Sequence, residues 1–281
     1  MHISPTIADI RQTVASYRAN GETVALVPTM GALHAGHMAL VRQAKTTAER
    51  VIAWIFVNPT QFDKAEDLAA YPRTMDQDLA MLRAEGVDAV FTPKADEIYP
   101  DGAETIVETT RMANMLHGLI RPGHFRGVTT VVAKFFNIVQ PDFAMFGEKD
   151  YQQLQVIKRM VRDLHMPIQI IGVPTVRDAD GLALSSRNVR LSAQDRQAAL
   201  VLNHALDHAQ VIAPTRPTVS DLQNQIASLI EAQSGAKLEG CDIVQAGTLA
   251  DIEGPISGPT AIMISAQVGP VLLIDQRVIT P

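Results

Sequence analysis

Short apolar runs alternate with segments of helical periodicity over roughly the first 176 residues of the chain. The runs TVALVPT (23–29) and VIAWIFV (51–57) have the length and the β-branched composition of buried strands. Between them, apolar positions within 36–49 recur at helical spacing. This alternation is typical of a parallel sheet with helices on both faces.

The alternation continues along the chain. The further elements expected are a helix over 73–86 closed by Gly86, a strand at DAVFTP (88–93), a helix over 128–140, a strand at FAMFG (143–147), a helix from about 149 to 165 and a strand at PIQIIGVPTV (167–176). Five to six such units predict an α/β fold with a Rossmann-like, doubly wound parallel sheet.

A different pattern follows residue 176. Two helices are expected within 192–235, separated by the proline-containing segment 213–220, with Thr218 or Ser220 capping the second helix. The stretch after 240 alternates short apolar runs with Gly-Pro turns, which favours a small antiparallel sheet. We therefore predict a Rossmann-like domain over 1–176 and a smaller α+β domain over 177–281.

Composition narrows the class of protein. The 281 residues are 47% hydrophobic and 19% charged, enough to bury a substantial core. A formal net charge of −6 without a basic block gives no electrostatic support for a nucleic-acid partner. Cys241 is the single cysteine, so no intrachain disulfide can form. Because no signal-peptide pattern or membrane-length apolar run is present, we expect a cytoplasmic protein without a membrane partner.

The segment PTMGALHAGHMALV (28–41) places His34 and His37 three residues apart, beside Gly31 and Gly36. It follows a predicted strand and opens a predicted helix, and open α/β sheets bind ligands at this edge. Unpaired backbone N–H groups and the helix dipole favour an anion there, and two imidazoles can donate to phosphate oxygens. The pattern therefore indicates a phosphate site.

Two alternatives remain open for this histidine pair. A pair at helical spacing can bind zinc, but the chain lacks a cysteine partner and the glutamate of the HExxH pattern. Either histidine could also be a hydrogen-bonded core residue.

Two further stretches carry polar chemistry. In FGEKDYQQLQ (146–155), Gln153 lies one helical turn beyond Lys149, so a cation and an amide share one face. In DGLALSSRN (180–188), two hydroxyls and Arg187 offer a polyphosphate site. An exposed first helical turn and a capped interdomain loop are the respective alternatives.

Taken together, HAGH and SSRN resemble the paired signatures of the nucleotidylyl-transferring α/β superfamily, which includes class I aminoacyl-tRNA synthetases. More narrowly, PTMGALHAGH, FVNPTQF, YPRT, RPGHFRGVTTVV, FGEKDYQQ and GLALSSRN resemble, in order, the motifs of the pantothenate synthetase (pantoate–β-alanine ligase) family. They span residues 28–188. Leu184 stands where the wider superfamily often has lysine, which argues against a tRNA synthetase.

This resemblance implies an ATP-dependent carboxylate–amine ligase. Pantoate would react with ATP to give pyrophosphate and an enzyme-bound pantoyl adenylate, which β-alanine would convert to pantothenate and AMP. Mg²⁺ is expected to accompany ATP, because a hard cation neutralises the polyphosphate. The resemblance also implies a homodimer formed through the larger domain.

The resemblance also implies a set of site residues. The ATP-binding residues are Met30, Gly31, Ala32, Leu33, His34, Ala35, Gly36, His37, Gly147, Glu148, Lys149, Asp150, Val176, Leu184, Ser185, Ser186 and Arg187. The catalytic residues among them are His34, His37, Lys149 and Arg187. His37 is expected to donate a proton to the departing pyrophosphate.

The other implied positions concern the two acceptor substrates and the metal. Gln61 and Gln153 are expected to bind pantoate, and Gln61 and Asn58 to bind β-alanine. His124 is a further candidate, at the phosphate end. Asp78 is the residue associated with magnesium, although Gln77 stands where some relatives have a second acidic residue.

Two other functions remain open at this point. Another nucleotidylyltransferase, joining AMP or CMP to a phosphorylated acceptor, would need a basic acceptor pocket in place of Gln61 and Gln153. A nucleotide-sensing module would bind ATP without releasing pyrophosphate.

Overall fold

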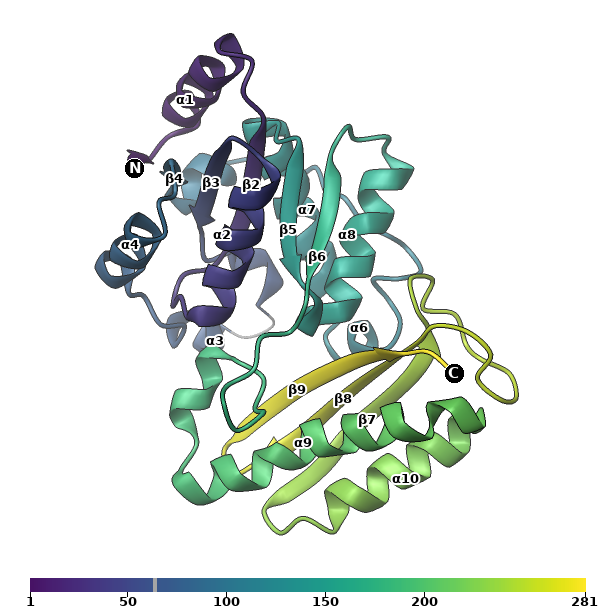
Figure 1. The fold of residues 1–281 in the computed structure, drawn as a ribbon. Coiled ribbons are helices and arrows are strands. Elements are labelled where there is room, and N and C mark those ends of the chain that lie inside the picture. Colours follow the sequence, from purple (N-terminus) through teal and green to yellow (C-terminus); the bar gives the residue numbers. More distant parts are fainter. Residues whose placement is uncertain (63–64) are drawn as a thin grey trace. The chain divides into compact units, whose positions relative to one another are not determined.

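The computed structural model describes residues 1–62 and 65–281, and the chain divides into two compact units. The N-terminal unit comprises Met1–Gly147 and Gln152–Val173. The C-terminal unit comprises Glu148–Tyr151 and Pro174–Pro281. Each unit has its own sheet and its own hydrophobic core (Figure 1).

The N-terminal unit is built on a six-stranded sheet in the order β1-β4-β3-β2-β5-β6, and every strand pair is parallel. The strands are β1 (His2–Ser4), β2 (Val24–Thr29), β3 (Arg50–Ile55), β4 (Ala89–Phe91), β5 (Phe143–Gly147) and β6 (Gln169–Val173). The chain moves outward from β2 in one direction and from β5 in the other, so the order reverses between these two central strands. The predicted doubly wound sheet is confirmed, and its switch point lies where β2 and β5 end.

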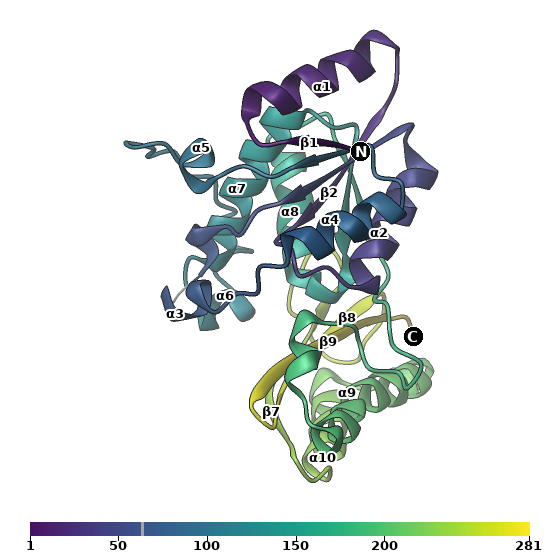
Figure 2. The same ribbon diagram turned by 90° about the vertical axis from the view of Figure 1, so that its left-hand side faces the viewer.

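Helices cover both faces of this sheet, because successive strand residues point to opposite sides. The helices are α1 (Ile7–Ala19), α2 (Ala35–Thr47), α3 (Ala65–Ala69), α4 (Met75–Ala84), α5 (Ala95–Ile98), α6 (His117–Ile120), α7 (His124–Val139) and α8 (Tyr151–Asp163), with a 3₁₀ turn η1 (Pro59–Gln61). Leu26 packs in the cluster formed by α1, α7 and α8, whereas its neighbour Val27 packs in the cluster formed by α2 and α4. Figure 2 shows these helical layers from the side.

The C-terminal unit contains the predicted antiparallel sheet, in the order β7-β8-β9. Its elements are η2 (Glu148–Asp150), η3 (Ser186–Arg190), α9 (Ala193–Ile212), η4 (Ala213–Thr215), α10 (Val219–Glu231), β7 (Ala236–Gln245), β8 (Thr260–Val268) and β9 (Val271–Ile279). Apolar residues of α9 and α10 pack against the sheet, Leu206 and Ile226 being fully buried there. Thr218 caps α10 by accepting the N–H of Asp221 at 3.1 Å, as predicted, and Ser220 lies inside the helix.

Several element boundaries differ from the predictions. The helix expected over 128–140 begins at His124, because Gly123 adopts a φ of 82° that ends the preceding turn. Its β-branched residues are all buried, so packing outweighs their weak helical preference. The helix expected from 149 is divided into η2 and α8, and β1 and α1 were not anticipated.

Candidate functional site

The loop between β2 and α2 is held in an unusual conformation at the switch point of the sheet. Gly31 and Ala32 have φ angles of 84° and 51°. A Cβ on Gly31 would lie 3.0 Å from Oδ2 of Asp78. Both the positive φ and this close approach therefore favour glycine at the position. For Ala32 the left-handed conformation costs about 1–2 kcal/mol, which the surroundings must offset.

Asp78 supplies that compensation. Its side chain, 1% exposed in the first turn of α4, accepts the N–H groups of Ala32 at 3.0 Å and Leu33 at 2.8 Å. Thr74 donates its hydroxyl to the same carboxylate at 3.1 Å. Hydrogen bonds to an ionised acceptor are among the stronger ones in proteins. The carboxylate therefore fixes the backbone that leads into α2.

The predicted link between Asp78 and magnesium stays a prediction. Within residues 1–62 and 65–281, no three His, Cys, Asp or Glu side chains gather closely enough to hold a metal ion. What Asp78 holds in the structure is the loop.

The two histidines close the N-terminus of α2. His34 is the N-cap, and its Nδ1 accepts the N–H of Gly36 at 3.1 Å. His37 reaches back, and its Nδ1 accepts the N–H of His34 at 3.3 Å, completing a reciprocal capping box. The ring centroids are 4.1 Å apart.

This capping defines the tautomers of both rings. A ring nitrogen that accepts a backbone N–H carries no proton, so each neutral imidazole bears its proton on Nε2. The pair thus combines two Nε2–H donors with the positive end of a helix dipole. The geometry suits an anionic ligand better than a zinc ion or a buried core.

A second group of polar residues follows β3. Asn58 is 1% exposed and caps η1. Its Oδ1 accepts from Thr60 Oγ1 and from the Tyr99 hydroxyl, both at 2.9 Å, and its Nδ2 donates to Oε1 of Gln61 at 3.0 Å. Asn58 Nδ2 also donates to the carbonyl oxygen of Gly127 at 3.2 Å. The amide group of Asn58 is therefore used within the protein, to orient the turn that carries Gln61.

His124, the first residue of α7, and Arg121, which follows α6, both contact the carbonyl oxygen of Gln61 in the same turn. Nδ1 of His124 lies 2.9 Å from the carbonyl oxygen of Gln61, which can only accept, so Nδ1 carries the proton. The opposite nitrogen, Nε2, faces Arg121 Nη1 at 3.3 Å and accepts from it. Nε2 of Gln61 lies 3.3 Å from Sδ of Met30, so the turn after β3 meets the loop after β2. The structure thus brings the predicted residues Met30, Asn58 and Gln61 together.

Two adjacent glutamines of α8 have different environments. Gln153, the predicted substrate contact, is half-buried. Gln152, 4% exposed, donates from Nε2 to the carbonyl oxygens of Met112 and Met115, at 3.0 and 2.8 Å. Its Oε1 accepts the N–H of His117 at 3.1 Å. Gln152 therefore has a structural function that the sequence analysis did not identify.

The remaining predicted nucleotide residues belong to the C-terminal unit, except Gly147 at the end of β5. Lys149 lies in η2. Val176 and Leu184 are joined by a hydrogen bond of 2.9 Å from the Leu184 N–H to the Val176 carbonyl oxygen. Ser185 caps η3 by accepting the N–H of Arg187 at 3.2 Å. Val176 and the segment 184–187 therefore lie side by side in one hairpin.

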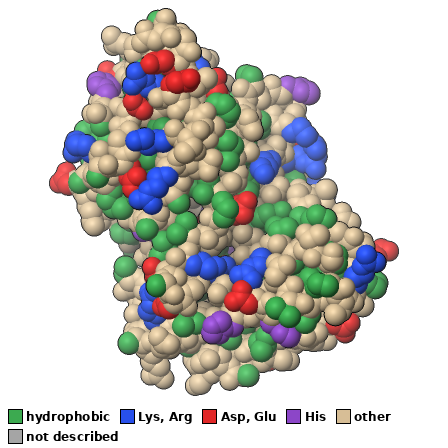
Figure 3. Space-filling model, in the orientation of Figure 1, with side chains coloured by type: hydrophobic (Ala, Val, Ile, Leu, Met, Phe, Trp, Pro, Cys, Tyr) green, Lys and Arg blue, Asp and Glu red, His purple; other side chains and the backbone are tan. Residues whose placement is uncertain are grey.

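On the face drawn in Figure 3, basic and acidic groups are interspersed in each unit. No helix within the described residues is long and apolar enough to cross a membrane.

The motif order and the fold agree with a match to a family model. The model, Pantoate-beta-alanine ligase, matches residues 2–278. The chain belongs to the pantoate-β-alanine ligase family. The match covers both units, whereas the motifs that predicted it span only 28–188.

Similar proteins and structures support membership of the pantoate-β-alanine ligase family. The pantothenate synthetase of Rhizobium meliloti strain 1021 is 45% identical over 282 residues, covering 100% of this chain and 97% of that protein. That of Aeromonas hydrophila subsp. hydrophila is 48% identical over 276 residues, covering 97% and 96%.

Two solved structures agree. The pantothenate synthetase of Thermus thermophilus is 41% identical, with a TM-score of 0.92 and full coverage of both chains. The pantoate-β-alanine ligase of Francisella tularensis, complexed with β,γ ATP and β-alanine, is 36% identical, with a TM-score of 0.80 and coverage of 99% and 97%. The predicted family and fold are confirmed.

Proposed function

We propose that this chain catalyses the ATP-dependent condensation of D-pantoate with β-alanine, giving pantothenate, AMP and pyrophosphate. The reaction is the last step of pantothenate (vitamin B5) biosynthesis. The observation that carries the proposal is the capped pair His34 and His37 at the switch point of the sheet, in a chain of this ligase family. Two Nε2–H donors at a helix N-terminus form a site for phosphate.

In the first step, a carboxylate oxygen of pantoate attacks the α-phosphorus of ATP. The bond from this phosphorus to the bridging oxygen breaks, and pyrophosphate leaves with the electron pair. We assign His34 and His37 to the phosphates, with the Nε2–H of His37 donating a hydrogen bond to the departing pyrophosphate. Because negative charge grows on pyrophosphate as the bond breaks, a donor at this point acts most strongly in the transition state.

In the second step, the amine of β-alanine attacks the acyl carbon of pantoyl adenylate. AMP leaves with the electron pair of the acyl–oxygen bond, and the new amide nitrogen loses a proton. Adenylation is needed because a free carboxylate is a poor acyl donor. This sequence requires no covalent bond to the enzyme.

Gln61 and Gln153 are the assigned pantoate contacts, and Gln61 also serves β-alanine. An amide side chain offers a donor and an acceptor to hydroxyl and carboxylate groups. We assign Asn58 and His124 to orienting Gln61, since their polar atoms already bind the turn around it. This assignment replaces direct contact of Asn58 with β-alanine.

The remaining nucleotide contacts are assigned to η2 and to the hairpin of the C-terminal unit. Lys149 and Arg187 supply positive charge, and Ser185 and Ser186 supply hydroxyl donors to the phosphates. Gly147 to Asp150, Val176 and Leu184 complete the set. The half-buried or exposed side chains of η2 and of 184–187 leave these groups available to a ligand.

Mg²⁺ is proposed to enter with ATP. Since the described residues contain no cluster of metal-binding side chains, phosphate oxygens and water would supply most of its ligands. Its chemistry would be to neutralise the polyphosphate. The proposed homodimer rests on the motif resemblance, and sedimentation of the purified protein tests it.

The decisive experiment measures pyrophosphate release from ATP with D-pantoate, with and without β-alanine, followed by mass analysis of products. The proposal is supported if pantoate alone gives a single turnover of pyrophosphate release. Adding β-alanine should then make the release catalytic and yield pantothenate and AMP. Absence of pantoate-dependent release from folded, ATP-binding protein would favour a nucleotidylyltransferase with another acceptor, or a nucleotide sensor.

A further inference from the structure

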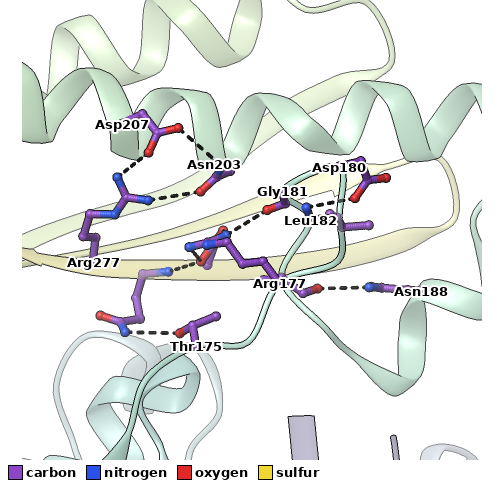
Figure 4. A network of polar contacts seen from close by, with 12 residues as sticks. Thr175, Arg177, Asp180, Gly181, Leu182, Asn188, Asn203, Asp207 and Arg277 are labelled. Carbon is purple, nitrogen blue, oxygen red and sulfur yellow. Dashed lines mark hydrogen bonds and ion pairs between the residues drawn. The ribbon is translucent and has the colours of Figure 1, made fainter. Parts of the chain in front are cut away.

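An ion pair in the C-terminal unit, between the half-buried Arg177 and the buried Asp275, joins β9 to the hairpin that carries the proposed nucleotide contacts. Arg177 donates from Nη1 and Nη2 to the two carboxylate oxygens of Asp275, at 2.6 and 2.9 Å. Asp275 is 3% exposed and lies 98 residues further along the chain. The same Nη1 also donates to the carbonyl oxygen of Gly181 at 3.2 Å (Figure 4).

The hairpin closes directly beside this pair. Arg177 and Ala183 form an antiparallel bridge, and the N–H of Leu184 donates to the Val176 carbonyl oxygen at 2.9 Å. Asn188 donates from Nδ2 to the Ala183 carbonyl oxygen at 3.0 Å. The guanidinium therefore holds the strand leading from Val176 and the turn at Gly181 in one fixed relation.

A buried ion pair contributes little net stability, because desolvating both charges offsets most of their attraction. Its rigid, bidentate geometry instead selects one arrangement of the groups it joins. Here those groups are a sheet strand and a hairpin with two proposed nucleotide contacts, Val176 and Leu184. This argues for a role in positioning.

We infer that Arg177, paired with Asp275, is a positioning residue that presets the 176–187 hairpin for ATP. The inference rests on the proposed function, which assigns this hairpin to the nucleotide. Arg177 fixes the backbone around Val176 and Leu184 and acts on ATP only through them. Loss of the fork therefore loosens the hairpin and weakens nucleotide binding, while leaving pantoate and β-alanine binding unaffected.

The test compares Arg177→Lys with Arg277→Lys. Arg277 lies on β9, two residues from Asp275, and makes a similar forked contact with Asp207 at 2.5 Å and Asn203 at 3.1 Å, on α9. It makes no hydrogen bond to the hairpin among the described residues, so it controls for losing an arginine fork in the same unit. Figure 4 shows Arg277 with its contacts to Asp207 and Asn203, and Arg177 with its contact to Gly181.

Three readouts are needed: hydrogen exchange at the Leu184 amide, affinity for a non-hydrolysable ATP analogue, and the separate KM values for ATP, pantoate and β-alanine. We expect Arg177→Lys to speed the exchange and to weaken analogue binding by about tenfold, the equivalent of losing one charge-assisted hydrogen bond. The KM values for pantoate and β-alanine should not change. Arg277→Lys should resemble wild type in all three.

A second variant separates positioning from folding. The double substitution Arg177→Met with Asp275→Leu removes both charges and avoids leaving one buried alone, so it should keep the wild-type Tm within a few degrees. It should still show the faster exchange and the weaker analogue binding. The inference would be overturned if this folded variant and Arg177→Lys both showed wild-type exchange and wild-type affinity. It would also be overturned if Arg277→Lys lost as much as Arg177→Lys.

The same set distinguishes this inference from the proposed function. If the wild-type protein forms no pantothenate, the proposed function fails whatever the variants show. If pantothenate forms and Arg177→Lys binds ATP as tightly as wild type, the positioning role alone fails.

Discussion

Oδ1 of Asp78 lies 2.8 Å from the backbone nitrogen of Leu33, although 45 residues separate them in sequence. With Oδ2 accepting from Ala32, this one buried carboxylate fixes the loop that ends in the His34 cap. The proposed anion site at α2 therefore depends on a residue of another helix, α4.

Asp78→Asn tests this dependence. The amide keeps the size of the carboxylate but turns one acceptor into a donor that faces a backbone N–H group. We expect a loss of about 1–3 kcal/mol in the free energy of unfolding, the usual cost of an unsatisfied buried group, together with weaker ATP binding. Asp76→Asn, an exposed change in the same helical turn, is the control. Equal stability of the two variants would contradict the role of Asp78.

Gly127→Ala tests the contact between α7 and η1. A Cβ at this position would lie 2.4 Å from the carbonyl oxygen of Thr60, which belongs to the turn that carries Gln61. Relieving this overlap should displace the turn, cost about 1–3 kcal/mol of stability and raise the KM for pantoate. Gly258→Ala, where a Cβ meets nothing within 4 Å, is the control for denaturation and kinetics. An unchanged pantoate KM would show that the turn does not set pantoate binding.

The parallel sheet could be predicted from the sequence because its information is local. Buried strands such as Val24–Thr29 are continuous apolar runs, and the helices between them repeat with a period near 3.6. The closeness of His34 and His37 was also visible in the sequence, because the two residues are only three apart. Their capping box is seen in the structure. Backbone conformation then set one boundary, since Gly123, with a φ of 82°, starts α7 four residues before the predicted position.

The residues that support the site could not be found this way. Arg177 and Asp275 are 98 residues apart, and no local pattern links them. Asp78 was associated with magnesium, but its hydrogen bonds to Ala32 and Leu33 join residues more than 40 positions apart, so no local pattern indicated them. Gln152 is an intermediate case: it lies four residues before the buried Val156, so helical periodicity could have placed it on the buried face of α8.

Acid should weaken the hairpin through Asp180. Its hydrogen bond from Arg196, 2.8 Å long, holds the pKa of that carboxyl below its usual value, with the Leu182 N–H acting in the same direction. The unfolded chain then binds the proton more tightly than the folded one, so this stabilisation is present above the ordinary aspartate pKa of about 4 and is lost as pH falls through the folded-state pKa.

Asp180→Asn checks the sign of this effect. Denaturant unfolding at neutral pH should show a less stable variant, and the gap to wild type should narrow in acid, where wild-type Asp180 is itself protonated. A gap that stays constant with pH would mean that Asp180 does not titrate differently in the two states.

His37→Ala should separate ATP binding from catalysis. If the His37 proton matters most as pyrophosphate departs, the variant retains most of its ATP affinity but loses much of its adenylation rate. Single-turnover pyrophosphate release and equilibrium binding of an ATP analogue measure the two quantities. Losses of equal size in both would assign His37 to ground-state binding only.

His34 has two functions that a pair of substitutions can separate. Its Nδ1 caps α2, and its Nε2–H is the proposed phosphate donor. His34→Ala should lose both, with a capping cost of about 0.5–2 kcal/mol. His34→Asn should restore the cap, because asparagine is a preferred N-cap residue, while its shorter side chain cannot also reach the phosphate. We therefore expect His34→Asn to unfold like wild type but to bind ATP as weakly as His34→Ala. Full ATP affinity in His34→Asn would show that the helix N-terminus, and not the imidazole, holds the phosphate.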